Sequence, residues 1–299
     1  MTVATLQGAV RLTDWGVIRA SGDDARAFLH GQLTQDVLQL DEHSARLAGY
    51  CSAKGRLLAS FVVWQRGPNE VLLACSADLL APTLKRLSMF VLRAKCKLSD
   101  ATAELPLFGV VGGDVPAAVW GRSVVGSADL IRLPDAAGHT RCLWAGAEPP
   151  PAGPLLDAEA WRWLEVQSGV PRIVAATAEQ FVPQMVNLEV VGGVNFQKGC
   201  YPGQEIVARS QYRGTLKRRA FLFDSDAAAA PGQELFTSTE PDQPAGMVAA
   251  AAAAPDGSGR FAVLAEAKIA ALDAELHLGS STGPRLTPTA LPYTLPAAA

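Results

Sequence analysis

One short stretch, residues 195–214, holds most of the side chains in this chain that could do chemistry. It combines a thiol, a carboxylate, cations and turn residues in the order Asn-Phe-Gln-Lys-Gly-Cys-Tyr-Pro-Gly-Gln-Glu-Ile-Val-Ala-Arg-Ser-Gln-Tyr-Arg-Gly. Lys198 lies two residues before Cys200, and the Pro-Gly turn that follows allows a helix to begin at Gln204. A nearby cation and a helix N-terminus both favour the thiolate form of a cysteine. Cys200 is therefore a candidate reactive thiol, and the alternative is a structural cysteine on a tight turn.

The neighbours of this cysteine are further candidates for the same site. Lys198 and Tyr201 flank the thiol along the chain. Two roles are open to Glu205. It either orients Lys198 or Arg209, or it complements the positive end of the helix as an acid in the first turn, which we favour.

The composition is that of an ordinary globular protein with more than one domain. The chain has 299 residues, of which 49% are hydrophobic and 18% are charged, and this length predicts two or three domains. The formal net charge of -3 excludes a global basic field, so any contact with RNA has to be local. Two local clusters of cations could serve: Arg209, Arg213, Lys217, Arg218 and Arg219 in one, and Lys85, Arg86, Arg93, Lys95 and Lys97 in the other.

The cysteines do not predict a disulfide framework or a metal site. There are five, widely spaced and without a Cys-x-x-Cys pair, and none of the four histidines lies at ligand spacing from a cysteine. The sequence also lacks a basic segment followed by an apolar one at its start, and it has no run of about 18 apolar residues. We expect no membrane segment and a location in the reducing cytoplasm.

The first third of the chain mixes strand and helix patterns in an order typical of an α+β fold. Capping residues and apolar spacing predict one helix after the first strand and a second, longer helix before the last strand. The remaining apolar segments predict strands that form an antiparallel meander. The predicted strands are 15–20, 45–51, 56–64, 70–75 and 95–98, and the longer helix is 77–92.

The middle and the end of the chain differ in their patterns of apolar and turn residues. A strand over 107–113, a short helix over 114–120 and a helix from Asp157 are predicted, and a nucleotide fold is disfavoured because the G-x-G-x-x-G spacing is absent. From Lys217 onward short apolar runs alternate with turn residues, as in a small β-barrel. The alanines 249–254 favour a helix by propensity, yet the Pro-Asp-Gly-Ser-Gly that follows favours a hairpin, and we predict a strand.

At the cysteine the residues resemble a known family. Lys198-Gly-Cys-Tyr-Pro-Gly-Gln-Glu205, preceded by Phe181-Val-Pro-Gln-Met-Val-Asn-Leu-Glu189, resembles the signature of the YgfZ-type folate-binding proteins, relatives of the glycine-cleavage T-protein. The resemblance extends along nearly the whole chain, through Asp14-Trp15, Phe28-Leu-His-Gly-Gln-Leu-Thr-Gln-Asp36, Ala53-Lys-Gly-Arg56, Trp161 with Gly169-Val-Pro, and Leu291-Pro-Tyr293.

This resemblance implies a multi-domain T-protein-like fold arranged around a central opening. The implied parts are an α+β folate-binding region over 1–105, a second α+β region over 106–214 that can interleave with the first, and a C-terminal β-barrel over 215–299. It also implies a tetrahydrofolate bound where the first two parts meet. The implied role is in iron–sulfur protein maturation, and through iron–sulfur enzymes in tRNA modification such as methylthiolation.

Four residues are candidates for contact with the folate. Trp15 and Trp161 match the two tryptophans that are linked to folate binding in the family, and aromatic surfaces suit the rings of a folate. Gln184 and Asn187 precede the signature, where they either hydrogen-bond the edge of the pterin or cap their own loop.

This chain lacks acidic residues that the aminomethyltransferases have, so folate binding has to be considered separately from catalysis. Those relatives carry acidic residues shortly after the equivalent of Lys54-Gly55, whereas this chain continues Arg-Leu-Leu-Ala-Ser. Aminomethyl transfer is therefore not expected. The leading hypothesis is a tetrahydrofolate-binding accessory protein for iron–sulfur cluster assembly or repair, with Cys200 as its reactive thiol. The alternatives are a tetrahydrofolate-dependent one-carbon transferase with an unidentified acceptor and a module that binds tRNA directly.

Overall fold

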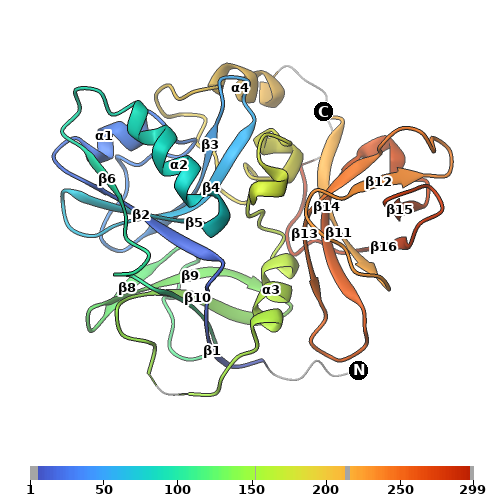
Figure 1. Ribbon diagram of the computed structural model, residues 1–299, viewed down its shortest axis with the longest axis horizontal. Helices are drawn as coiled ribbons and strands as arrows, with labels where there is room; N and C mark the ends of the chain where they lie inside the picture. Colours follow the sequence, from blue (N-terminus) through green and yellow to red (C-terminus); the bar gives the residue numbers. More distant parts are fainter. Residues whose placement is uncertain (1–5, 152, 213–215, 297–299) are drawn as a thin grey trace.

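Two antiparallel sheets and one closed barrel make up the molecule, as Figure 1 shows. The structure is a computed structural model, and it describes residues 6–151, 153–212 and 216–296. The predicted α+β class is confirmed, and so is the C-terminal barrel. The three bodies meet around the centre of the molecule, where α3 (Ala158–Gln167) lies.

The first sheet carries the predicted meander, and its strand order is β3-β4-β5-β2-β6. Alternating apolar residues bury one face of these strands under α1 (Ala25–His30) and α2 (Ala77–Met89). All four pairings are antiparallel. The strands are β2 (Trp15–Ser21), β3 (Ala45–Cys51), β4 (Leu57–Gln65), β5 (Glu70–Ser76) and β6 (Lys97–Asp100).

The second sheet has the order β1-β7-β10-β9-β8 and packs its inner face against α3 and the barrel. The helix begins where predicted, because the side chain of Asp157 accepts a hydrogen bond from the Glu159 backbone as an N-cap. The strands are β1 (Gly8–Arg11), β7 (Leu107–Val111), β8 (Arg122–Val125), β9 (Ala128–Ala136) and β10 (His139–Ala145).

The short helix predicted over 114–120 is wrong. Residues 112–121 form an irregular connection between β7 and β8. The end of this connection is fixed by a hydrogen bond to β9, because the Trp120 N–H donates to the carbonyl of Arg132, 2.8 Å away. Trp120 itself has a φ of 65°, a value that no α-helix permits.

The chain crosses between the first two bodies more than once. Strand β1, near the start of the chain, pairs with β7 in the second sheet rather than with the first sheet. Conversely, side chains after α3 return to the core of the first body, among them Ile173, Phe181, Leu188 and Val207. This return segment contains the short helices η1 (Ala175–Thr177) and η2 (Pro183–Val186) and then α4 (Gln204–Tyr212).

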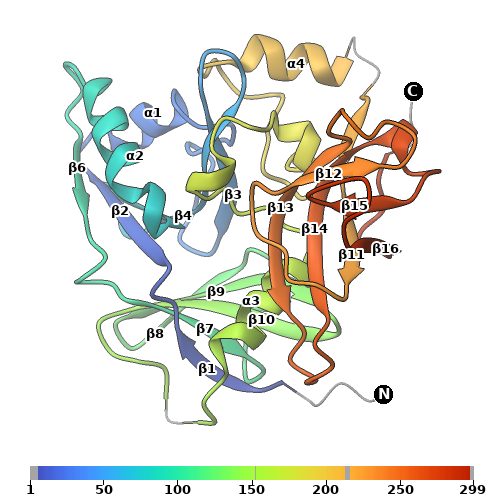
Figure 2. The same ribbon diagram turned by 45° about the vertical axis from the view of Figure 1, so that its right-hand side comes forward.

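The C-terminal region closes into a six-stranded barrel in the order β11-β14-β13-β12-β15-β16. The alanine run lies in β13, as predicted, because it pairs with β14 across the turn at Pro255. Helix α3 packs on β13 and β14, between the second sheet and the barrel (Figure 2). The strands are β11 (Arg218–Ser225), β12 (Glu234–Thr237), β13 (Gly246–Ala253), β14 (Phe261–Lys268), β15 (Leu276–Leu278) and β16 (Arg285–Thr289), with η3 at Ile269–Ala271.

Within the described residues, no helix has the length and apolar character that crossing a membrane would require.

Candidate functional site

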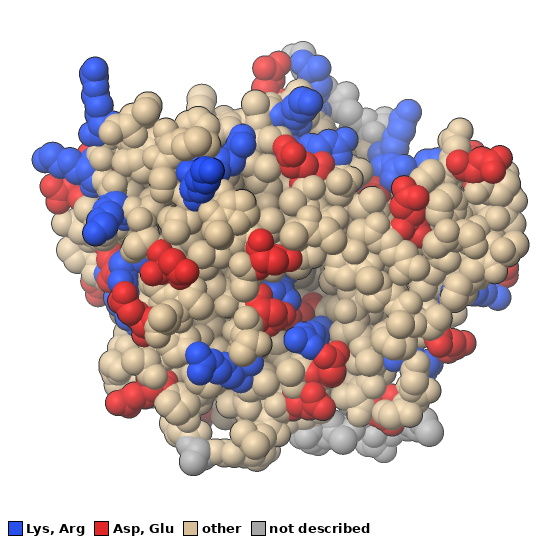
Figure 3. Space-filling view, viewed as in Figure 1, with Lys and Arg blue, Asp and Glu red and all other residues tan. Residues whose placement is uncertain are grey.

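A central cavity of about 210 Å³ opens where the two sheets and the barrel meet. Its apolar wall comes from β3, β4, β9 and β13, and its charged residues lie at the start of β2, on β10, on α3 and in the loop after α3. Acidic and basic side chains meet near the centre of the face in Figure 3. The charged lining residues are Asp14, Arg141, Arg162, Glu165 and Arg172.

Trp15 lines this cavity and is held there by Arg172. The guanidinium of Arg172 lies 4.8 Å from the centroid of the Trp15 ring, and it donates to both the backbone carbonyl and the carboxylate of Asp14. The indole N–H of Trp15 approaches Glu165 but has no aligned acceptor. Trp15 thus lies on the wall of the cavity, and its indole N–H has no hydrogen-bond acceptor among the described residues.

Glu165 lies one turn after Trp161 on α3 and also lines the cavity. Its side chain is 16% exposed and lies 3.4 Å from Arg172. Burial raises the pKa of this carboxyl group, and the charge of Arg172 only partly opposes the shift. A buried carboxyl group with a raised pKa can accept from a ligand when it is ionised and donate when it is protonated.

Trp161 is not on the wall of the cavity, contrary to its expected role as a pocket residue. It is 1% exposed, and its indole fills the space above Gly109, where a side chain Cβ would overlap the ring. The guanidinium of Arg141 lies over this ring, 5.3 Å from its centroid. Trp161 therefore supports Arg141 from behind, and Arg141 is the residue that faces the cavity.

Gln184 and Asn187 are buried, and their side-chain amides form hydrogen bonds within the protein. The amide of Gln184 donates to the carbonyl of Val207, which ties η2 to α4. Asn187 ends η2 in the left-handed conformation, and its amide donates to the Ala220 carbonyl and to Tyr293. Neither residue lines the central cavity, so we do not assign them to the pterin edge.

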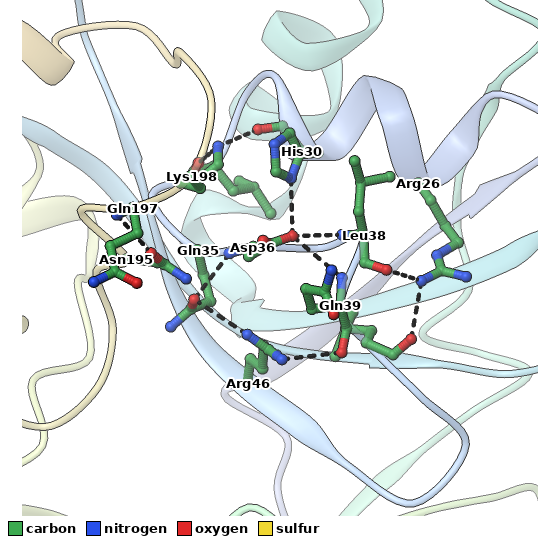
Figure 4. Close-up of polar contacts among 12 residues, drawn as sticks. Arg26, His30, Gln35, Asp36, Leu38, Gln39, Arg46, Asn195, Gln197 and Lys198 are labelled. Atoms are coloured by element: carbon green, nitrogen blue, oxygen red, sulfur yellow. Dashed lines mark hydrogen bonds and ion pairs between the residues drawn. The ribbon is translucent and has the colours of Figure 1, made fainter.

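The cysteine loop, residues 198–203, lies on the other side of the first body, against the end of α1. Lys198 is 8% exposed, and its ammonium group donates to the carbonyls of His30 and Leu33 (Figure 4). Burial lowers the pKa of Lys198 to about 8, while the charges of Asp36 and Cys200 oppose the shift. The lysine thus binds the carbonyl end of α1 and still acts electrostatically on the thiol.

Cys200 itself is exposed, and all five cysteines are free. Helix α4 begins at Gln204, as predicted, but Cys200 lies four residues earlier, so the thiol is outside the first turn. Because helix-dipole effects fall off within that turn, the dipole contributes less to thiolate formation than the sequence suggested. Exposure and the nearby lysine remain as the features that favour a reactive thiol.

The other two candidates in this region have distinct positions. Tyr201 is 6% exposed, its ring lies 5.0 Å below the Lys198 ammonium, and its hydroxyl has no partner among the described residues. Burial raises the pKa of this phenol well above its usual value. Glu205 is exposed in the first turn of α4 and pairs with Arg209 at 3.2 Å, so it does not contact Lys198.

A glycine fixes the cysteine loop on the turn at residues 52–55. Gly203 has a φ of 78°, and a Cβ there would collide with the Ser52 carbonyl and lie 2.6 Å from the Gly55 nitrogen. Only glycine permits this approach of two backbones. The turn that precedes the acid-free segment therefore packs against the loop, and the next residue, Arg56, donates to the Gln180 carbonyl.

The cation cluster proposed for RNA is largely paired within the protein. Arg219 forms a buried ion pair with Glu189, and Arg218 binds both oxygens of Glu266 at 2.8 and 3.0 Å. Lys217 is exposed, and Arg213 lies outside the described residues. Among the members of this cluster that the structure describes, only Lys217 forms no ion pair, which weakens the case for direct tRNA binding by these residues.

Comparison with known proteins gives the family. No family model matches the chain. The tRNA-modifying protein YgfZ of Edwardsiella ictaluri is 34% identical over 252 residues, which is 74% of this chain and 72% of that protein. The YgfZ proteins of Photobacterium profundum and Colwellia psychrerythraea are 31% and 30% identical over similar shares. This chain belongs to the YgfZ family.

The fold of this chain is that of the T-protein. The glycine cleavage system aminomethyltransferase T from Bartonella henselae superposes with a TM-score of 0.76 and 14% identity, over 98% of this chain and 87% of that one. The predicted resemblance to the YgfZ family and the T-protein-like fold are thus confirmed. At this identity the likeness establishes the fold alone.

Sequence reasoning missed four charged residues of this YgfZ chain's central cavity, namely Arg141, Arg162, Glu165 and Arg172. Two of them, Glu165 and Arg141, had a signal in the sequence. Glu165 follows Trp161 by four residues and therefore lies on the same face of the helix. Arg141 alternates with Leu143 and Ala145 along β10, so it is an arginine at an inward position among apolar residues.

Proposed function

We propose that this chain binds a tetrahydrofolate in the central cavity and acts as an accessory factor in the assembly or repair of iron–sulfur clusters, with Cys200 as its reactive thiol. Its effect on tRNA would be indirect, through iron–sulfur enzymes that modify tRNA by steps such as methylthiolation. The observation that carries the binding proposal is a cavity whose buried donors lack partners: Trp15 Nε1 and Arg141 Nη1.

The chemistry of the cavity fits a folate in parts. Its volume of about 210 Å³ is below the range of roughly 300–1,000 Å³ for whole ligand sites, so it suits the bicyclic ring rather than the entire molecule. Trp15 supplies an aromatic face, and Glu165 supplies a group that hydrogen-bonds a ring edge. Arg162 is 40% exposed at the cavity and could bind the acidic glutamate tail.

The thiol proposal rests on a different part of the molecule. Cys200 is exposed, while Cys51, Cys75 and Cys142 are buried with raised pKa values. Only an exposed thiol can exchange a sulfur or iron species with a partner protein. Binding and thiol chemistry are therefore separable, and the cytoplasm is the compartment in which such a thiol stays reduced.

Folate titration against tryptophan fluorescence tests the binding site. We expect tetrahydrofolate to quench the wild type, and Trp15→Phe to weaken binding several-fold. Trp163→Phe is the matched control, because Trp163 lies on α3 but does not line the cavity. Equal affinity of Trp15→Phe and wild type would remove Trp15 from the site.

A complementation assay tests the thiol. In a strain that lacks the protein, Cys200→Ser should fail to restore iron–sulfur enzyme activity while its folate affinity stays unchanged. Cys96→Ser, at a half-buried cysteine, should complement fully. Full complementation by Cys200→Ser would contradict the thiol role.

A one-carbon transferase with an unidentified acceptor is the second candidate. The observation that favours it is the raised pKa of Glu165, because burial makes this carboxyl group easier to protonate and so gives the cavity a group that can exchange a proton with a ligand. Consumption of 5,10-methylenetetrahydrofolate with a candidate acceptor, lost in Glu165→Gln, would support this activity. No consumption with any acceptor favours the accessory role.

A further inference from the structure

Arg141 differs from every other charged residue of the central cavity. Asp14, Arg162, Glu165 and Arg172 pair with one another. Arg141 forms no ion pair within the described part of the chain, and its Nη1 has no hydrogen-bond partner. It is nevertheless 3% exposed, so the protein has buried a guanidinium without an acceptor for one of its nitrogens.

The position of Arg141 is fixed by the surrounding fold. Its Nε donates to the Pro134 carbonyl at 3.0 Å, and its guanidinium plane lies over Trp161. The Gly109 position leaves room for that indole, since any side chain there would displace it. Arg141 is thus a supported residue on the wall of the cavity with an unused donor, which is typical of a recognition residue.

The charge of Arg141 persists at neutral pH. Burial lowers its pKa to about 10, which still leaves the guanidinium protonated. Burying an unpaired charge destabilises the free protein, and an acceptor on a bound ligand would offset that cost. Glu165 acts on Arg141 electrostatically but does not pair with it, so a ligand edge can lie between the two groups.

The part of the ligand that meets Arg141 follows from its depth. A charged glutamate tail needs water, and the half-exposed Arg162 suits it better. Arg141 is buried at a cavity whose volume of about 210 Å³ suits a bicyclic ring. The strongest acceptor on a pterin ring is its 4-oxo oxygen, whereas a 4-amino pteridine places N–H donors at the same position.

We infer that Arg141 is a specificity-determining residue that donates a hydrogen bond from Nη1 to the 4-oxo oxygen of a reduced pterin and so selects against 4-amino pteridines. This inference rests on the proposed folate binding. With a 4-amino ligand, the Arg141 N–H would face another donor, and both groups would be buried without an acceptor. The binding free energy lost in this way exceeds that of one hydrogen bond.

The test compares tetrahydrofolate with tetrahydroaminopterin, which differ only at position 4, by calorimetric titration at pH 8. The wild type should bind the 4-oxo ligand at least tenfold more tightly. In Arg141→Met the affinity for tetrahydrofolate should fall roughly tenfold to hundredfold, the affinity for the 4-amino ligand should change little, and the preference should disappear.

Two controls keep the outcome decisive. Arg162→Met should weaken both ligands by the same factor, because it removes a contact to their common tail. Without ligand, Arg141→Met should unfold at the same temperature as the wild type or a higher one, which excludes misfolding as the cause. Folate binding without a preference at position 4, or equal losses for both ligands in Arg141→Met, would overturn this inference alone. Failure of the wild type to bind either ligand would overturn the proposed function as well.

Discussion

The guanidinium of Arg172 lies 4.8 Å from the ring centroid of Trp15 and also donates to the Asp14 carboxylate at 2.7 Å. It therefore joins the loop after α3 to the first residues of β2, two segments that are more than 150 positions apart in the sequence. The tryptophan that faces the cavity is held in place by the same arginine that neutralises its neighbour. Orientation of the ring and stability of the fold are thus linked through one side chain.

Arg172→Ala should destabilise the protein and weaken folate binding together. The change leaves Glu165 without its cation and Asp14 with only the more distant Arg162, so we expect a loss of about 2 kcal/mol in the free energy of unfolding, measured in urea. Arg162→Ala removes an exposed pair with Glu159 and a 3.8 Å contact with the partly exposed Asp14, so it should cost no more than about 0.5 kcal/mol. Equal effects of the two variants would show that the Arg172 network contributes nothing specific.

Gly203→Ala should release the cysteine loop from the turn at residues 52–55. The new Cβ would collide with the Ser52 carbonyl, and we expect a cost of about 2–3 kcal/mol. Gly192→Ala is the matched control, because Gly192 has a similar φ of 82° with no atom within 4 Å of the added Cβ. That variant should cost about 1 kcal/mol from backbone strain alone. Identical costs would mean that the close packing at Gly203 is unimportant.

Native-state thiol labelling at pH 7 should modify Cys200 first. Burial raises the pKa of Cys51 and Cys75 to about 12 and that of Cys142 to about 11, so these thiols are both inaccessible and protonated. Cys96 is half-buried, and burial raises its pKa as well. The fast phase should therefore correspond to one thiol and vanish in Cys200→Ser. A fast phase that survives this substitution would assign the reactivity to another cysteine.

Lys198 should give the protein a stability that increases with pH in the alkaline range. Its pKa is lowered from 10.5 to about 8 on folding, so between these values the unfolded chain binds more protons than the folded one. The free energy of unfolding then rises with pH over this window, by about 3 kcal/mol at most. Below pH 8, Lys198 contributes no pH dependence to it.

The buried tyrosines and cysteines titrate in the opposite sense, so the measurement has to be a difference. We therefore compare the free energies of unfolding of wild type and Lys198→Met in denaturant from pH 7 to 10. As the pH rises, the free energy of unfolding of the wild type should increase relative to that of the variant. A difference that is independent of pH would indicate an ordinary pKa for Lys198 in the folded protein.

Local patterns in the sequence predicted the elements of the first sheet well, because its strands and helices carry clear apolar periodicity, whereas β1, β8, β9 and β10 of the second sheet were not predicted. The alanines of β13 show the value of turn chemistry over propensity, since the turn after Ala254 decided their structure. The helix expected over 114–120 is absent because a hydrogen bond from Trp120 to Arg132 of β9, a contact between residues distant in the sequence, fixes the end of an irregular connection.

The site was less predictable for the same physical reason. Cys200, Lys198 and Trp15 stand out by type and neighbours, whereas the burial of Gln184 and Asn187 depends on how η2 packs against α4 and β11. Trp161 and Arg141 form one unit only after α3 and β10 pack together. No spacing within either segment reveals that the arginine, and not the tryptophan, reaches the cavity.

Hydrogen exchange with and without saturating tetrahydrofolate tests the central claim most directly. Binding in the central cavity predicts slower amide exchange at the start of β2, in β10 and from the end of α3 to residue 174, with no change in the cysteine loop at 198–203. Absence of protection under saturating ligand, or protection confined to the cysteine loop, would contradict the account.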